Sequence, residues 1–139
     1  MRAGLVSPKD AVKIWDKVSP MLQRVVDQTE GELQPKDFLH NIVNKHMHLW
    51  IVIEKQNIVI VVITQIINYP NKKILRIIAL AGKNFKEAYN QFNSMIESFA
   101  IESGCSGLEL WGRKGWKKML PEWKSNYIVF TKNLKERMD

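Results

Sequence analysis

Apolar residues recur at helical spacing in the first third of the chain. Over residues 11–25 they stand three and four positions apart, which predicts an α-helix with a single buried face. Ser7, which is followed by a proline, is typical of a helix start, and Pro20 predicts a kink or a division into two short helices. A second helical pattern begins at Gln34 and ends near His46.

The pattern then changes to nearly continuous runs of β-branched residues. These runs predict strands at 49–54, 58–67 and 74–80. Because the polar links between the runs are short, the three strands should form an antiparallel meander. Since the runs are apolar on both faces, we expect helices to cover both sides of the sheet.

A long helix and a fourth strand follow the meander. Apolar residues over 85–99 form a helical stripe, and Asn84 with Glu87 resembles a capping box at its start. Gly104 is a natural end for this helix. Residues 108–111 then predict a strand parallel to the last strand of the meander, because a right-handed crossover joins the two.

The end of the chain predicts two more elements. One is a short helix over 113–120, which Pro121 ends, and the other is a strand over 127–131. The element order is therefore ααβββαβαβ, which predicts an α/β (mixed α+β) fold with a mixed sheet of about five to six strands flanked by helices. Without repeats or linkers, residues 1–139 are expected to form one domain.

The chain is strongly basic, with 21 Lys and Arg against 14 Asp and Glu, a net charge of +7 and a pI of about 9.6. Such a balance favours anionic ligands or acidic partners. Four basic residues cluster at helical spacing: Arg113, Lys114, Lys117 and Lys118. They predict either a solvated helix face or a patch for an anion, an acceptor or nucleic acid, of which nucleic acid is the least favoured.

Cysteine and histidine usage limits the chemistry. Cys105 is the single cysteine, so an internal disulfide is excluded, and its place between a helix and a strand predicts a buried side chain. His40, His46 and His48 have no cysteine or acidic cluster beside them, so we expect no metal site. No signal pattern opens the sequence, and the run 58–67 is too short to span a bilayer, which favours a cytoplasmic protein without membrane contact.

Three short motifs stand at fixed places in this order of elements. Leu-Trp at 49–50 opens the first strand of the meander, Gly-Cys at 104–105 precedes the fourth strand, and Gly-Arg-x-Gly-Trp at 112–116 follows it. Together with the element order, over residues 15–134, the chain resembles the GNAT superfamily of acyl-CoA N-acyltransferases. It also looks like a group of small GNAT-like proteins of tailed bacteriophages, some described as internal virion proteins and others as acetyltransferases.

The resemblance implies an acyl-CoA, such as acetyl-CoA, and an amine acceptor. It places the pyrophosphate at Ala81, Gly82, Lys83 and Asn84, where a turn leads into the N-terminus of the long helix. Active GNAT proteins have a longer loop with more than one small residue here, and many have a tyrosine on the short helix that protonates the thiolate. This short helix has none, and Tyr127 is the nearest in sequence, so the resemblance assigns no catalytic residue.

Two glutamates are candidates for accepting a proton from the amine. Glu54 ends the first predicted meander strand and Glu109 lies in the fourth strand, although a solvated glutamate on a strand face is the commoner case. Strand N–H groups could stabilise the oxyanion. Three functions stay open: an acetyl-CoA-dependent N-acetyltransferase, an inactive GNAT-fold protein of a phage virion or acting on a host protein, and a nucleic-acid-binding domain.

Overall fold

The computed structural model describes residues 1–29, 32–111, 116–125 and 128–134. The elements follow one another as β1 (Arg2–Val6), α1 (Pro8–Val26), α2 (Pro35–Val43), β2 (His48–Glu54), β3 (Asn57–Tyr69), β4 (Lys72–Gly82), α3 (Phe85–Glu102), β5 (Gly107–Leu110) and α4 (Trp116–Met119). The described sheet has the order β1-β2-β3-β4-β5, with β4 and β5 parallel and the other neighbours antiparallel. No helix within the described ranges is both long and apolar enough to cross a membrane.

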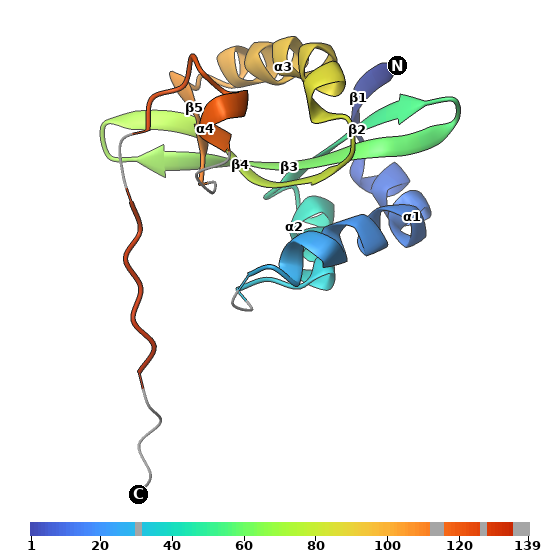
Figure 1. Cartoon of the computed structure of the whole chain (residues 1–139), viewed down its shortest axis with the longest axis horizontal. Helices are drawn as coiled ribbons and strands as arrows, with labels where there is room; N and C mark the ends of the chain where they lie inside the picture. Colours follow the sequence, from blue (N-terminus) through green and yellow to red (C-terminus); the bar gives the residue numbers. More distant parts are fainter. Residues whose placement is uncertain (30–31, 112–115, 126–127, 135–139) are drawn as a thin grey trace, which may run out of the picture.

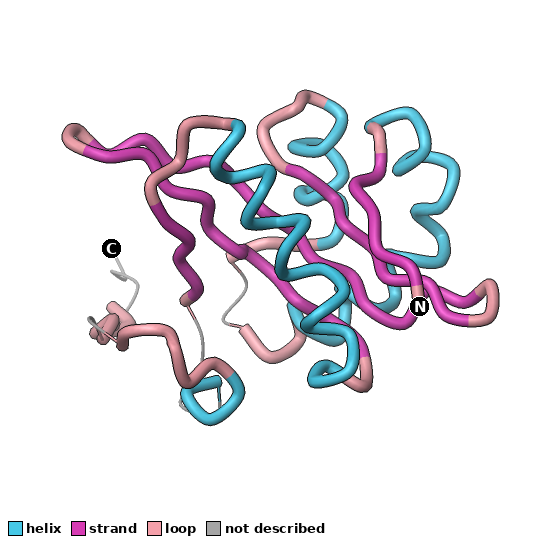
Figure 2. The backbone as a smooth tube through the Cα atoms, turned by 90° about the horizontal axis from the view of Figure 1, so that it is seen from above, coloured by secondary structure: helices cyan, strands magenta, loops and turns pink. Residues whose placement is uncertain are grey.

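Helices cover both faces of the sheet (Figure 1). On one face, α1 and α2 pack over a core that includes Leu49, Val61 and Ile63. On the other face, α3 crosses the strands diagonally (Figure 2), and its side chains Phe92 and Ile96 enter a second core cluster. This arrangement confirms the predicted α/β class and the predicted cover on both faces.

Two strands of the predicted meander run further than the pattern predicts. β3 reaches Tyr69, and β4 continues through Ala81 to Gly82, which pairs with Ile60. Small and polar residues carry little strand signal of their own, but pairing with a neighbouring strand satisfies their backbone groups. The turn before α3 is therefore shorter than predicted and leaves Lys83 as the link to the N-cap residue of the helix.

Gly104 ends α3 as predicted, in a Schellman motif. Its φ is 83°, and its N–H donates to the carbonyl of Ile101 at 3.0 Å. The N–H of Cys105 donates to the carbonyl of Ala100 at 2.8 Å, which completes the motif. Cys105 is free and buried, which confirms the predicted environment of its side chain.

The N-terminal part departs from the prediction in two ways. β1 is missing from the predicted elements, because a five-residue edge strand becomes recognisable only through its pairing with β2. Of the two outcomes predicted at Pro20, a kink or a division into two helices, the division is wrong, since α1 continues through Pro20. Val18 and Leu22 are fully buried while Pro20 is exposed, so core packing holds the helix and water can reach the carbonyl that the proline frees.

The predicted strand over 127–131 is also wrong in the part that the structure describes. Residues 128–134 belong to no strand and lead away from the sheet (Figure 1), while Tyr127 lies outside the described residues. Ile128, Val129 and Phe130 are exposed. High β-propensity does not make a strand where no neighbouring edge pairs with it, so the described sheet has five strands.

Candidate functional site

β4 continues beyond the end of its parallel neighbour β5. Its last pair with β5 joins Ile77 to Leu110, whereas its pairing with β3 continues to Gly82. The register with β3 shifts at Ile63, so that Ile78 has no partner there, as in a β-bulge. The edge of β4 from residue 78 to residue 82 that faces away from β3 therefore has no described strand beside it, and we call it the open edge.

Neighbouring contacts show which backbone groups line the open edge. The N–H of Lys83 donates to the carbonyl of Val59 in β3 at 3.2 Å. Because successive residues of a strand direct their backbone groups to opposite sides, Ala81 faces β3, and Leu80 and Gly82 face the open side. The open edge thus offers backbone donors and acceptors where the sequence placed the candidate turn.

This edge leads into the N-terminus of α3. Asn84 is the N-cap residue, with φ 59° and ψ 43°, and its side chain makes no capping hydrogen bond. The predicted capping box is therefore wrong, because a residue that caps through its side chain normally has extended rather than left-handed φ and ψ. The first N–H groups of α3 have no side-chain cap and lie next to the exposed Lys83, an arrangement that suits an anion.

The packing of β4 on β3 requires glycine at position 82. Gly82 has a φ of 135°, and a Cβ there would overlap the carbonyl oxygen of Val59 and lie 2.9 Å from the Cα of Ile60. The side chain of Ala81 is buried. Of the four residues predicted for the pyrophosphate, Lys83 and Asn84 are thus the two with exposed side chains.

α4 packs against the beginning of α3. The rings of Trp116 and Phe85 meet edge to face, with their centroids 4.9 Å apart. Lys117 and Lys118 are exposed, so the described half of the predicted basic patch is solvated. Both residues belong to α4, the helix that contacts Phe85 at the start of α3. The other two residues of the predicted patch, Arg113 and Lys114, lie outside the described residues.

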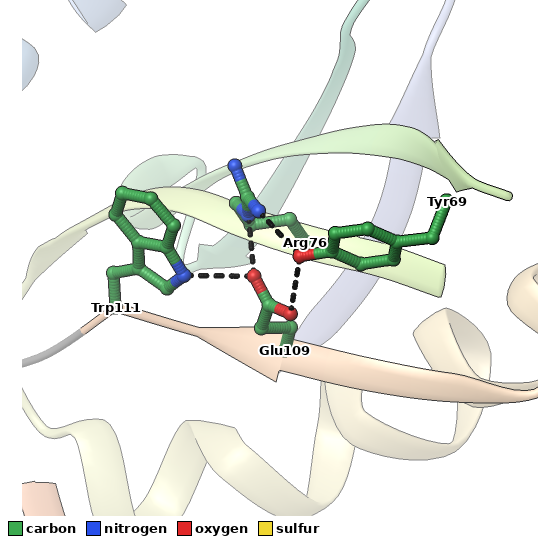
Figure 3. A network of polar contacts seen from close by, with 4 residues as sticks. All are labelled: Tyr69, Arg76, Glu109 and Trp111. Atoms are coloured by element: carbon green, nitrogen blue, oxygen red, sulfur yellow. Dashed lines mark hydrogen bonds and ion pairs between the residues drawn. The ribbon is translucent and has the colours of Figure 1, made fainter. Parts of the chain in front are cut away.

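A polar cluster joins the ends of β3 and β5 to β4, next to the start of the open edge (Figure 3). Glu109 accepts hydrogen bonds from Nε of Arg76 at 2.7 Å, the hydroxyl of Tyr69 at 3.1 Å and the indole N–H of Trp111 at 2.7 Å. Arg76 also donates to the Tyr69 hydroxyl at 3.0 Å and stacks over the Trp111 ring, 4.2 Å from its centroid. The cluster holds Trp111, which is 63% exposed, just after the end of β5.

These contacts make Glu109 a poor proton acceptor. Burial would raise the pKa of its carboxyl, but the hydrogen bonds from Arg76, Tyr69 and Trp111 outweigh burial and hold the pKa below its ordinary value. A carboxylate with a lowered pKa is a weaker base. Glu54, the other candidate, ends β2, so β3 and β4 lie between it and the open edge.

The sequence identified Glu109 but not its partners. Arg76 is the one charged residue in the apolar run 74–80, and that interruption is the signal that could have identified it. Tyr69 lies beyond the end of the predicted strand 58–67, and nothing in its local sequence points to a residue forty positions away.

A second polar group is buried under α3. Thr64 is fully buried, and its hydroxyl accepts the indole N–H of Trp50 at 2.9 Å and lies 3.1 Å from Nδ1 of His48. Phe99 contacts both rings edge to face. Burial lowers the pKa of His48, and a hydrogen bond with Thr64 opposes that effect in part, so the imidazole is a neutral structural group.

The remaining histidines are at the surface. His40 is exposed, with its Nε2 3.3 Å from the side-chain nitrogen of Asn44, and His46 is exposed in the loop before β2. Among the residues that the structure describes, no three His, Cys, Asp or Glu side chains group as a metal site would require.

The two lowered pKa values predict a loss of stability in acid. His48 titrates in the folded state below its ordinary value of 6.5, so stability is complete above that pH and declines as pH falls toward the folded pKa. Glu109 adds a further decline below its ordinary value of 4.5. Urea midpoints measured from pH 3 to pH 8 should show both declines, and His48→Gln should remove only the upper one. A wild-type midpoint that stays constant between pH 7 and pH 5 would contradict the account of His48.

Solved structures with the same fold include acetyltransferases. A probable acetyltransferase matches with a TM-score of 0.75 and 8% identity, over 99% of this chain and 100% of its own. An aminoglycoside acetyltransferase from an uncultured soil metagenomic sample, in complex with sisomicin, gives 0.70 and 12%, over 96% of each chain. A ribosomal-protein-alanine N-acetyltransferase from Brucella melitensis biovar Abortus 2308 gives 0.64 and 16%, over 93% of this chain and 98% of its own.

At these identities the likeness establishes the fold, and the chain has the GNAT fold that its order of elements predicted. No protein-family model matches the sequence, and no curated protein sequence is significantly similar to it. The narrower resemblance to phage proteins therefore stays a prediction.

Proposed function

We propose that this protein is an N-acyltransferase that transfers an acetyl group from acetyl-CoA to an amine. The observation that carries the proposal is the open edge of β4, which leads directly into the uncapped N-terminus of α3. The GNAT fold shared with an aminoglycoside acetyltransferase and a ribosomal-protein-alanine N-acetyltransferase supports it.

The residues at the open edge fit an acyl-CoA. Lys83 and the first N–H groups of α3 would hold the diphosphate, since they offer a positive charge and several donors. Backbone groups of Leu80 and Gly82 would bind the extended arm, and an N–H of this edge would stabilise negative charge on the acyl oxygen. When bound, acetyl-CoA would supply a thioester; the amine nitrogen would bond to the acyl carbon as the carbon–sulfur bond breaks, and the sulfur would take a proton from solvent and leave as the thiol.

We assign removal of the amine proton to solvent. Glu109 is engaged by three donors, and Glu54 is separated from the open edge by two strands. Glu109 instead positions Trp111 and Arg76 on the face beside the open edge, where an acceptor would approach. Its role is therefore to fix neighbouring side chains rather than to transfer the proton.

We also propose that the chain is a GNAT-like protein of the phage type. Two of the motifs on which that resemblance rests have structural roles here, since Leu49 and Trp50 are buried in β2, and Gly104 and Cys105 form the cap of α3. The second candidate is an inactive GNAT-fold protein of a phage virion, or one that binds a host protein. It is favoured because the Glu109 carboxylate already accepts hydrogen bonds from three side chains and is a poor base.

Binding of acetyl-CoA tests the proposal. Calorimetric titration of the wild type should give a micromolar dissociation constant, and Lys83→Ala should weaken binding about tenfold because a charge-assisted bond to phosphate is lost. Desulfo-CoA should bind the wild type, because it keeps the diphosphate.

Lys55→Ala is the matched control, since Lys55 is also exposed but lies in the turn between β2 and β3. It should leave binding within about twofold of the wild type. Absence of binding at millimolar acetyl-CoA, or equal losses in both variants, would contradict the proposed site. Binding without turnover on any amine would favour the inactive alternative.

A further inference from the structure

A hollow of about 410 Å³ lies at the other end of β4, against β3. One side is formed by Lys45 and His46 in the loop that leads into β2 and by His48, the first residue of β2. The other side includes Ile66 and Asn68 of β3 and Lys73 of β4. We call this hollow the β3 wedge.

The β3 wedge contains a free strand edge. Pairing between β2 and β3 ends at His48 and Thr64, and no described strand continues along that side of β3. A two-residue turn joins Tyr69 to Lys72, which form a hydrogen-bonded closing pair. Residues 65, 67 and 69 therefore direct their backbone groups to β4, and residues 66 and 68 direct theirs into the wedge.

The charge of the β3 wedge is positive. Lys45 and Lys73 line it together with His46, and no carboxylate lies among its lining residues. The ammonium of Lys73 donates one hydrogen bond to the carbonyl of Ser103, at 2.6 Å, which leaves it two further donors. Lys45 is exposed and has a φ of 63°.

We propose that the β3 wedge binds an extended acidic segment of a partner protein, which adds a short strand to the free edge of β3. A strand edge offers N–H donors and carbonyl acceptors in alternation, and a peptide backbone matches both. Carboxylates of the segment meet Lys45 and Lys73. A nucleic acid lacks this alternating backbone, so it fits the positive charge but not the edge.

This inference does not depend on the proposed acyltransferase. The wedge is at Lys73 and the diphosphate turn follows Gly82, nine residues along the same strand, a separation of about 30 Å. The protein can therefore lack acetyl-CoA binding and still bind the peptide, or the reverse, so the two proposals are tested independently.

The test is an NMR titration of the ¹⁵N-labelled full chain with the blocked peptide acetyl-Glu-Val-Glu-Val-Glu-amide. We expect saturable shifts centred on the amides of Ile66 and Asn68 and on the His46 ring. Lys45→Glu should weaken binding at least fivefold. Lys55→Glu is the matched control, since Lys55 also lies in an exposed turn with positive φ, and it should change binding less than twofold.

Two further probes separate strand addition from simple charge attraction. The same peptide with alternate amides N-methylated keeps its charge but cannot pair with a strand, so it should not bind. Equal binding of the methylated peptide, equal losses in the two lysine variants, or no binding at millimolar peptide would each overturn the proposal. A single-stranded oligonucleotide that shifts the Ile66 and Asn68 amides more strongly than the peptide would do so as well.

Discussion

Gly82→Ala is expected to destabilise the fold by about 3 kcal/mol or more. Gly82 has a φ of 135°, where a side chain is strained, and a Cβ would overlap the carbonyl oxygen of Val59. Ile60, also in contact, is fully buried in the core and cannot move without disturbing its neighbours. Urea unfolding monitored by tryptophan fluorescence measures the loss.

Gly107→Ala provides the matched control. Gly107 also lies in a strand of the sheet, but a Cβ there meets no atom within 4 Å. The control should stay within about 0.5 kcal/mol of the wild type. Similar small effects of both substitutions would contradict the packing that we assign to Gly82.

Gly82→Ala also tests whether Gly82 is needed for folding or for ligand binding. If Gly82→Ala folds with nearly full stability but loses acetyl-CoA, then the glycine is needed for close approach of the ligand. If it loses stability as expected, the glycine serves the contact between β4 and β3, and Lys83 becomes the informative residue for binding.

Local pattern was sufficient for most of the fold. The stripe over 85–99, the C-terminal glycine of α3 and the β-branched runs each carry their signal within a few residues, so they predict α3 and the meander well. β1 and the end of β4 depend on pairing with a strand that is remote in sequence. Residues 128–131 show the opposite case, with strong strand propensity but no described strand beside them.

The candidate site also has one part that local sequence predicts and another that depends on remote pairing. The turn before α3 follows from the chain's local order, and the structure keeps Lys83 exposed there. The surroundings of Glu109 depend on the register that places Arg76 opposite it, 33 positions away. A pattern of single residues cannot supply that register, so the sequence left among the candidate bases a half-buried carboxylate that already accepts hydrogen bonds from three side chains.

Thr64→Val should cost about 2 kcal/mol of folding stability, because it leaves a buried donor without a partner. Valine has nearly the shape of threonine, so the substitution removes the hydroxyl and little else. That hydroxyl accepts the indole N–H of Trp50, which is itself almost fully buried. His48 loses its contact with the same oxygen. Thermal and urea unfolding at pH 7.5, where His48 is neutral, isolate the hydrogen bond from the titration.

A double-mutant cycle with Trp50 decides whether the hydroxyl acts through that indole. Trp50→Phe removes the N–H, so Thr64→Val should cost at least 1 kcal/mol less in that background than in the wild type. Thr64→Ser keeps the hydroxyl and should lose only about 1 kcal/mol for the methyl group. If Thr64→Val costs the same in both backgrounds, the stability would come from packing around Thr64. The hydrogen bond to Trp50 would then do no more than fix the orientation of the indole under α3.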